Sequence, residues 1–272
     1  MLQAPQRTGL SGPTLIRLLT RLTDAEVLES RQSLSDHLSH WLGWTDAIAL
    51  SAALNNRPPV IAPGSRPFGS AEERECVRVR ATLADAIASD TAATPAKKHQ
   101  DRSQAPVKKA LAEADADYSN FRQRYLSLQH TMETSIGNLR SRLRGMVAAR
   151  NGEMTRLAVV DAIMDRALLP KERALLGAIP KLLQGHFERL RLAEAAAMAN
   201  ANAEAETPAE AKAQPEPASE GDLTPLPVQT AAPITPGAWL DVFRNDMRSV
   251  LLAELDVRLQ PVEGLLAALR AS

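Results

Sequence analysis

Cysteine, glycine and aromatic residues are all scarce in this chain, and each scarcity removes a class of protein. Cys76 is the only cysteine among 272 residues, so neither an intramolecular disulfide nor a cysteine-based zinc site can form. The 13 glycines are scattered and form no phosphate-binding loop. Aromatic residues make up 3% of the chain and hydrophobic residues 44%. A core made mostly of Ala, Leu and Val favours helices over a β-sandwich.

Long hydrophobic runs are also missing. Eighteen consecutive apolar residues occur nowhere, and the longest apolar stretch near the end is broken by Glu254, Asp256 and Arg258. Arg17 and Arg21 likewise interrupt the apolar segment near the N-terminus. We therefore expect neither a membrane-spanning helix nor a secretory signal. Together with the single cysteine, this pattern favours a cytoplasmic protein.

The formal net charge is zero, but the charges are unevenly distributed. Residues 121–150 carry six arginines against one acid, whereas residues 201–222 carry six acids against one lysine. A basic stripe can bind nucleic-acid phosphates, which makes the first segment a candidate basic patch. The patch consists of Arg122, Arg124, Arg140, Arg142 and Arg144. Because no nucleic-acid-binding motif accompanies it, we favour ion pairing with acidic residues elsewhere in the chain.

The strongest periodic pattern is an apolar seam within residues 105–150. Its members follow one another at steps of three and four residues, the spacing of a coiled coil or a long bundle helix. They are Tyr118, Phe121, Tyr125, Leu128, Met132, Ile136, Leu139, Leu143 and Met146. A seam this long exceeds an ordinary globular helix of about eleven to twelve residues. We therefore expect a helix of a partner protein, or a second copy of this chain, to complete the bundle.

Two segments lack an apolar period, and we therefore expect them to be disordered linkers. They are residues 89–106 and residues 199–236, and the second contains seven prolines. They divide the chain into an N-terminal helical module (1–88), a long helical hairpin (107–198) and a C-terminal helix (237–272). No alternating strand pattern competes with the helical one. The predicted fold is all-α, an elongated helical bundle with a coiled-coil-like hairpin.

Local signals mark where the helices begin and bend. Ser33 is a suitable N-cap for a helix that starts just after it. Pro170 and Pro180 predict limits or kinks in the second half of the hairpin, and a turn is expected near residues 151–153. Pro261 is expected to bend or break the C-terminal helix.

The stretch DHLSHWLGWTDAIALSAAL, residues 36–54, holds two of the three tryptophans and two of the five histidines. His37 and His40 are three residues apart and could reach one metal ion, but a zinc site needs a third and usually a fourth ligand. We therefore expect no metal site here and interpret the stretch as densely packed. Trp41 and Trp44 are its candidate packing or partner-contact anchors, at the centre of the N-terminal module.

Further bulky residues are candidate anchors of the same kind. Tyr118, Phe121 and Tyr125 open the seam, where their alternation with arginines resembles a base-stacking platform, although a partner helix would bury them. Trp239 and Phe243 lie on the C-terminal helix, which either docks back on the bundle or binds a partner.

Signs of catalysis are weak. Asp161 and Asp165 lie one helical turn apart and could hold a metal or act as acid and base, but a solvated face is the more common use of such a pair. No G-x-S-x-G turn exposes a nucleophile, and a bystander role suits Cys76 best. We expect a non-enzymatic protein without catalytic residues, cofactor or metal. A metal-dependent enzyme is the weakest alternative.

Several long segments resemble a known bacterial family. They are SGPTLIRLLTRLTD, RQSLSDHLSHWLGWTDAIALSAAL, FRQRYLSLQHTMETSIGNLRSRLR, HFERLR and FRNDMRSVLLAELDVRLQPVEGLLAALR. The chain is similar through them to the domain-of-unknown-function family numbered three-three-four-eight, which has no assigned activity or cofactor. Genes of this family often neighbour genes for a long membrane-anchored coiled-coil protein and for a protein with an OmpA-like cell-wall-binding domain. The resemblance implies an accessory subunit of an envelope or stator-type assembly.

These observations together predict a structural or adaptor subunit of a bacterial multiprotein assembly, cytoplasmic and peripheral to the inner membrane. Its helical seams would bind a partner protein, with a membrane-anchored coiled-coil protein and a second copy of this chain as the candidates. The alternative is a nucleic-acid-associated protein that uses the basic patch, which we rank lower.

Overall fold

The computed structural model describes residues 13–23, 33–55, 69–91, 117–206 and 236–271. Within these ranges the chain is all-α, with eight helices and no strand, which confirms the predicted fold class. The helices are α1 (Thr14–Thr23), α2 (Leu34–Trp41), α3 (Trp44–Asn55), α4 (Ser70–Thr91), α6 (Tyr118–Ala148), α7 (Gly152–Leu176), α8 (Ile179–Glu206) and α9 (Ala238–Ala271). None of them combines the length and the apolar character that crossing a bilayer requires.

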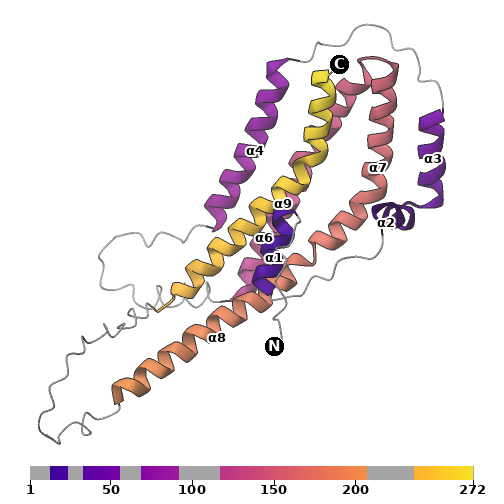
Figure 1. The fold of residues 1–272 in the computed structure, drawn as a ribbon. Helices are drawn as coiled ribbons and strands as arrows, with labels where there is room; N and C mark the ends of the chain where they lie inside the picture. Colours follow the sequence, from indigo (N-terminus) through magenta and orange to yellow (C-terminus); the bar gives the residue numbers. More distant parts are fainter. Residues whose placement is uncertain (1–12, 24–32, 56–68, 92–116, 207–235, 272) are drawn as a thin grey trace, which may run out of the picture.

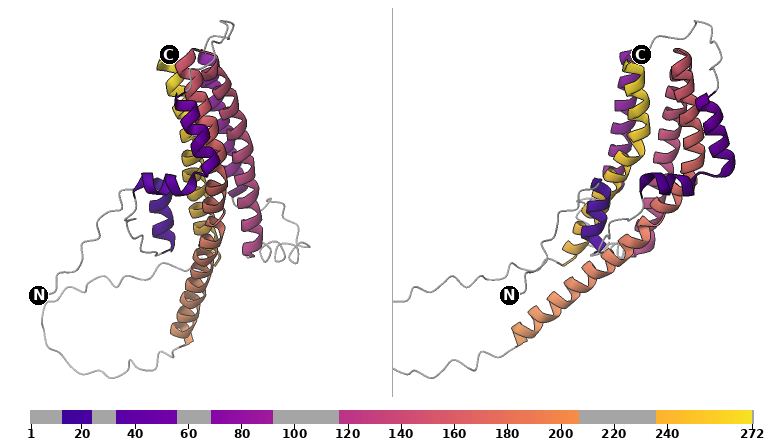
Figure 2. Two further views of the ribbon diagram at one scale, coloured as in Figure 1. Left: turned by 90° about the vertical axis from the view of Figure 1, so that its right-hand side faces the viewer. Right: turned by 45° about the vertical axis from the view of Figure 1, so that its right-hand side comes forward.

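The helices form an elongated bundle from which α8 extends at one end (Figure 1; Figure 2). Most of the two predicted linkers falls outside the described residues, so their disorder stays a prediction. At their edges, α4 continues to Thr91 and α8 continues to Glu206, so helix extends a short way into both predicted linkers.

Helices α6 and α7 pack against each other and are joined by a short turn, whereas the coiled-coil character expected of residues 107–198 stays a prediction. The turn between them is stabilised by Asn151, whose side chain accepts a hydrogen bond from the Met154 backbone N–H at 2.9 Å. The Thr155 hydroxyl donates to the Ala148 carbonyl at 2.7 Å and joins the two helix ends across the turn. Such caps satisfy backbone groups that helix ends leave free. The two helices consequently run antiparallel and in contact along their length.

A tight junction separates α7 from α8. A Cβ atom at Gly177 would lie 2.7 Å from the Arg173 carbonyl oxygen, so only glycine fits without a backbone shift. Pro180 occupies the first turn of α8, where a missing N–H costs little. Pro170 lies within α7, which is curved in Figure 1, as is common for a helix that contains proline. Of the two prolines expected to limit or kink a helix, Pro170 therefore lies in a curved helix and Pro180 lies at a helix start.

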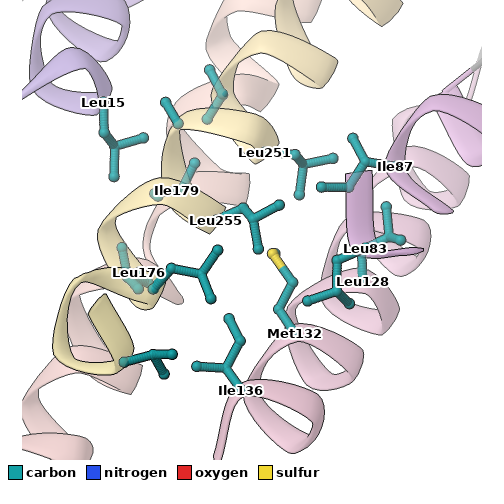
Figure 3. Packing of buried hydrophobic residues seen from close by; sticks show 14 of the residues in the cluster. Leu15, Leu83, Ile87, Leu128, Met132, Ile136, Leu176, Ile179, Leu251 and Leu255 are labelled. Carbon is teal, nitrogen blue, oxygen red and sulfur yellow. The ribbon is translucent and has the colours of Figure 1, made fainter. Parts of the chain in front are cut away.

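Helix α9 lies at the centre of the hydrophobic core. In Figure 3 its Leu251 and Leu255 lie among side chains from α4, α6 and the α7–α8 junction, including Ile87, Met132 and Ile179. The helix continues without a break through Pro261, with Val262 and the leucines beyond it buried. Burial of these side chains offsets the backbone hydrogen bond that the proline cannot make. The C-terminal helix thus docks back on its own bundle.

The apolar seam is buried, but it is covered within the chain. Its central members from Phe121 to Leu143 are buried, and Tyr118 and Met146 are partly buried against the same core. Helices α9, α7, α4 and α8 all pack against α6. The expectation that a partner helix completes this seam is therefore not met, because α9 supplies the missing helix.

The N-terminal helices do not gather around the tryptophans. Helix α1 packs on α8 and α9, α4 packs on α9 and α6, and α3 packs on α7. Ser33 caps α2 as predicted, with a reciprocal pair of hydrogen bonds to Asp36, but α2 ends at Trp41 and a new helix starts after Gly43. Trp44 is 83% exposed, and no residue of α3 is buried. The interpretation of this stretch as densely packed was therefore wrong.

Candidate functional site

The described core contains a buried carboxylate. Glu254 lies in the middle of α9 and is 0% exposed. Its oxygens accept hydrogen bonds from the Tyr125 hydroxyl at 2.7 Å and from the Gln129 amide at 3.0 Å, both on α6. Arg258, one helical turn further along α9, donates to the same carboxylate at 2.9 Å. These donors and the counter-charge replace the water that Glu254 loses on burial.

The same network reaches α7. Arg258 also donates to Glu172 at 2.8 Å, and the Gln129 amide donates to the Leu176 carbonyl at 3.1 Å. Burial raises the pKa of Glu172 above its usual value, and this effect outweighs the attraction of Arg258. Burial, reinforced by the neighbouring Glu254, also raises the pKa of Tyr125. The network therefore holds α6, α7 and α9 in one fixed register, with its polar groups engaged in mutual contacts.

Sequence reasoning missed this network. Glu254 and Arg258 were noted only as interruptions of an apolar stretch. Their spacing of four residues, within a stripe of buried leucines, is the available signal that an acid and a base pair along one helix. Nothing local, however, indicates that Tyr125 and Gln129 would meet them from a helix more than a hundred residues earlier in the chain.

The candidate basic patch is largely paired with acids of the same chain. Arg140 and Arg144 each bond to both Asp161 and Asp165 across the hairpin, at 2.6–3.2 Å. These four side chains form a cross-linked ion-pair cluster between α6 and α7. The acidic pair that could have served a metal or acid–base chemistry thus faces two arginines.

The other three arginines of the patch are dispersed. Arg142 bonds to Glu75 of α4 at 3.1 Å, which ties α4 to the hairpin. Arg122 is exposed and Arg124 is partly exposed near the start of α6, more than about four helical turns from Arg140. The five arginines therefore do not form one continuous basic surface.

Most of the candidate aromatic anchors meet in one cluster. The rings of Phe121 and Phe243 lie 5.1 Å apart, and the Tyr118 and Phe243 rings 6.2 Å apart. Phe187 of α8, which the sequence analysis did not single out, lies at the centre and contacts Trp239 at 4.9 Å. The Tyr118 hydroxyl donates to the Pro180 carbonyl. This cluster joins α6, α8 and α9 by edge-to-face packing, and its rings serve the fold.

His37 and His40 both lie on α2. The His37 ring lies 5.7 Å from Trp41 within α2, and His40 is exposed. Among the residues that the structure describes, no three His, Cys, Asp or Glu side chains are grouped closely enough to hold a metal ion. Cys76 is buried, and burial raises the pKa of its thiol.

Helix α3 has one face against the bundle and one face exposed to solvent. Its inner face, formed by Asp46, Ala49, Leu50 and Ala53, is partly buried on α7, where Asp46 bonds to Arg166 at 2.8 Å. Its outer face is exposed and carries no charge. The exposed residues are Trp44, Thr45, Ala47, Ile48, Ser51, Ala52, Leu54 and Asn55.

An apolar surface of this kind is unusual for an outer helix. Asp46 is the only charged residue among the twelve of α3, whereas a surface helix ordinarily presents a charged face to water. Trp44 is 83% exposed, Ile48 55% and Leu54 53%. Figure 1 shows α3 on the outside of the bundle, with α7 as the neighbour beside it. Contiguous exposed apolar side chains typically mark a protein interface, so the outer face of α3 is the candidate functional site.

Comparison with known proteins identifies a family but no characterised relative. Neither the curated proteins nor the solved structures contain a match to this chain. A family model described as "Protein of unknown function (DUF3348)" matches residues 1–271. That match spans nearly the whole chain and confirms the resemblance seen in its sequence: the protein belongs to the DUF3348 family.

Proposed function

We propose that this protein is a non-enzymatic structural or adaptor subunit of a bacterial multiprotein assembly, and that it joins the assembly through the outer face of α3. The observation that carries the proposal is the exposure of Trp44 and Ile48 on a helix with a single charged residue. Such a surface gains free energy when another apolar surface covers it, at about 25 cal/mol per Å² of apolar area buried.

The polar groups between the inner helices are paired within the chain, which supports the proposal. The buried Glu254 network and the Arg140–Asp161 cluster are engaged between helices of the same chain. They leave the outer face of α3 as the free contact surface, with α3 joined to α7 by the Asp46–Arg166 pair.

The setting of the assembly is part of the proposal. Genes of the family often neighbour genes for a membrane-anchored coiled-coil protein, which suggests a subunit on the cytoplasmic side of the inner membrane. A coiled-coil partner would offer helices with apolar stripes that suit an uncharged helix face.

The test is affinity capture of the tagged chain from its native cells, with quantitative mass spectrometry. Three versions are compared: the natural chain, the variant Ile48→Asp, and the control variant Val77→Asp. The control places the same charge on α4, at an apolar residue that is more exposed than Ile48 (68% against 55%). We expect specific proteins to be retained by the natural chain and the control and lost from Ile48→Asp. Recovery of the chain alone, or partners that ignore Ile48→Asp, would contradict the proposal.

A further inference from the structure

The outer face of α3 has a regular arrangement of large and small side chains. Trp44, Ile48 and Ala52 are spaced four residues apart and form one exposed ridge along the helix. The large indole lies at one end of the ridge, the isoleucine at the centre and the small alanine at the other end. Thr45 and Ser51 flank the ridge with small polar side chains.

This arrangement is complementary to itself. If two α3 helices are laid antiparallel with Ile48 facing Ile48, each Trp44 falls opposite the Ala52 of the other copy. Both residues lie about 6 Å along the axis from Ile48, because a helix rises about 1.5 Å per residue. The indole of each copy would therefore fill the space that the small alanine leaves. A two-fold symmetric contact requires a patch that is complementary to itself in this way.

The charge distribution favours the same occupant. Two copies that meet through one patch bring identical charges together, and any charge on the patch would repel its own image. The outer face of α3 has none, and Asp46 on the inner face is paired with Arg166. Neither lysine nor arginine occurs in α3, so the face offers no attraction to anionic lipid or nucleic acid.

We propose that α3 packs antiparallel against α3 of a second copy of this chain, about a two-fold axis at Ile48. The inference rests on the proposed function, because it takes the outer face of α3 as the assembly surface. The partner that it names is a second copy of this chain. A helix of twelve residues is about 18 Å long, so the contact is smaller than a standard protein interface. Interfaces below the standard size are typical of transient complexes, so the dimer should be in exchange with the monomer.

The experiment is sedimentation equilibrium of the full chain over a wide range of protein concentrations. The natural chain and the control Val77→Asp should show the same monomer–dimer equilibrium. Ile48→Asp should weaken it by roughly a hundredfold or more, because two carboxylates would face each other at the axis. Ile48→Lys should do the same. An equimolar mixture of the Ile48→Asp and Ile48→Lys variants should dimerise again, since the facing charges are then opposite.

The outcomes separate this inference from the proposed function. A natural chain that stays monomeric throughout, or a dimer that survives Ile48→Asp, overturns the α3–α3 contact. If the monomeric chain still captures other proteins through α3, the adaptor role stands and only the dimer fails. If the charge-swapped mixture dimerises but no other protein is captured, the dimer stands and the adaptor role fails.

Discussion

Glu254 shows how one residue can constrain three helices. A carboxylate in the core is costly, and its cost is met here by Tyr125, Gln129 and Arg258, which reach it only when α6 and α9 are in register. A slip of either helix would leave the charge without partners. The residue thus contributes to the choice of one packing arrangement among the several that leucine-rich helices permit.

Removing this carboxylate should destabilise the protein severely. The variant Glu254→Ala leaves Arg258 buried with Glu172 as its remaining partner. It removes the acceptor of the Tyr125 hydroxyl and leaves the Gln129 amide with the Leu176 carbonyl alone. We expect a loss of about 3–5 kcal/mol in the free energy of unfolding, measured by urea denaturation. The matched control is Asp256→Ala on the same helix, a half-exposed carboxylate that pairs with Arg80, for which the loss should stay below about 1 kcal/mol. Equal losses in the two variants would contradict the assignment.

Glu172 should make stability depend on pH in the acid range. Its pKa in the folded protein is raised above the ordinary value of 4.5, so the folded state takes up a proton at a higher pH than the unfolded state does. As the pH falls from neutral through the folded pKa towards 4.5, the natural chain should gain stability relative to Glu172→Gln. The gain should level off below 4.5. Urea denaturation of both proteins at several pH values measures it, and a difference that stays constant with pH would contradict the raised pKa.

At the scale of helices, the same kind of residue serves opposite purposes. Phe243 and Trp44 are both bulky aromatics on apolar helices, yet Phe243 is fully buried among other rings and Trp44 is almost fully exposed. The difference arises because α9 has apolar neighbours around much of its circumference, whereas α3 contacts chiefly α7. An aromatic residue therefore indicates an anchor without indicating whether the anchor holds the fold or a partner.

This difference predicts which aromatic residues stabilise the fold. Phe243→Ala should cost about 3–5 kcal/mol, because it opens a cavity in a closely packed cluster. Trp41→Ala on α2 should cost only about 1 kcal/mol, since the residue is only partly buried and none of the α2 side chains that the structure describes belongs to the core. Thermal or urea denaturation measures both. A larger loss from Trp41→Ala than from Phe243→Ala would show that the N-terminal stretch is a packed centre after all.

At the scale of the whole molecule, α9 is the element that makes the bundle one structure. It contacts α1, α4, α6 and α8, which are spread along the chain before it, and thirteen of its residues are buried. The three modules that the linkers suggest are therefore joined by one shared core. Contacts between segments so distant in sequence form only when most of the chain is present.

Removal of α9 should consequently unfold the rest of the bundle. A chain that ends at residue 235 should lose cooperative unfolding and bind the dye ANS through its exposed core, while keeping part of its helical circular dichroism. Addition of α9 as a separate peptide should restore protection of α6 amides from hydrogen exchange. A truncated chain that still unfolds cooperatively would show that the hairpin is an independent domain.

Much of the helical architecture could be predicted from local sequence. The seam from Tyr118 to Met146 and the N-cap at Ser33 were predicted correctly, because helical period and capping depend on residues a few positions apart. Trp44 was misplaced because α3 is apolar nearly all round, so its pattern does not say which face is covered. The Glu254 network was missed because its partners lie on another helix.

Composition and periodicity alone thus establish that this chain is helical, and they identify which residues of α6 and α9 form apolar faces, since both properties arise within a few turns of one helix. Which faces meet is a different matter, because any leucine-rich face can cover another with similar gain. Packing of the folded chain assigns α9 to the seam of α6 and leaves the outer face of α3 uncovered. That assignment depends on shape, register and the buried Glu254–Arg258 pair, which come together only in three dimensions.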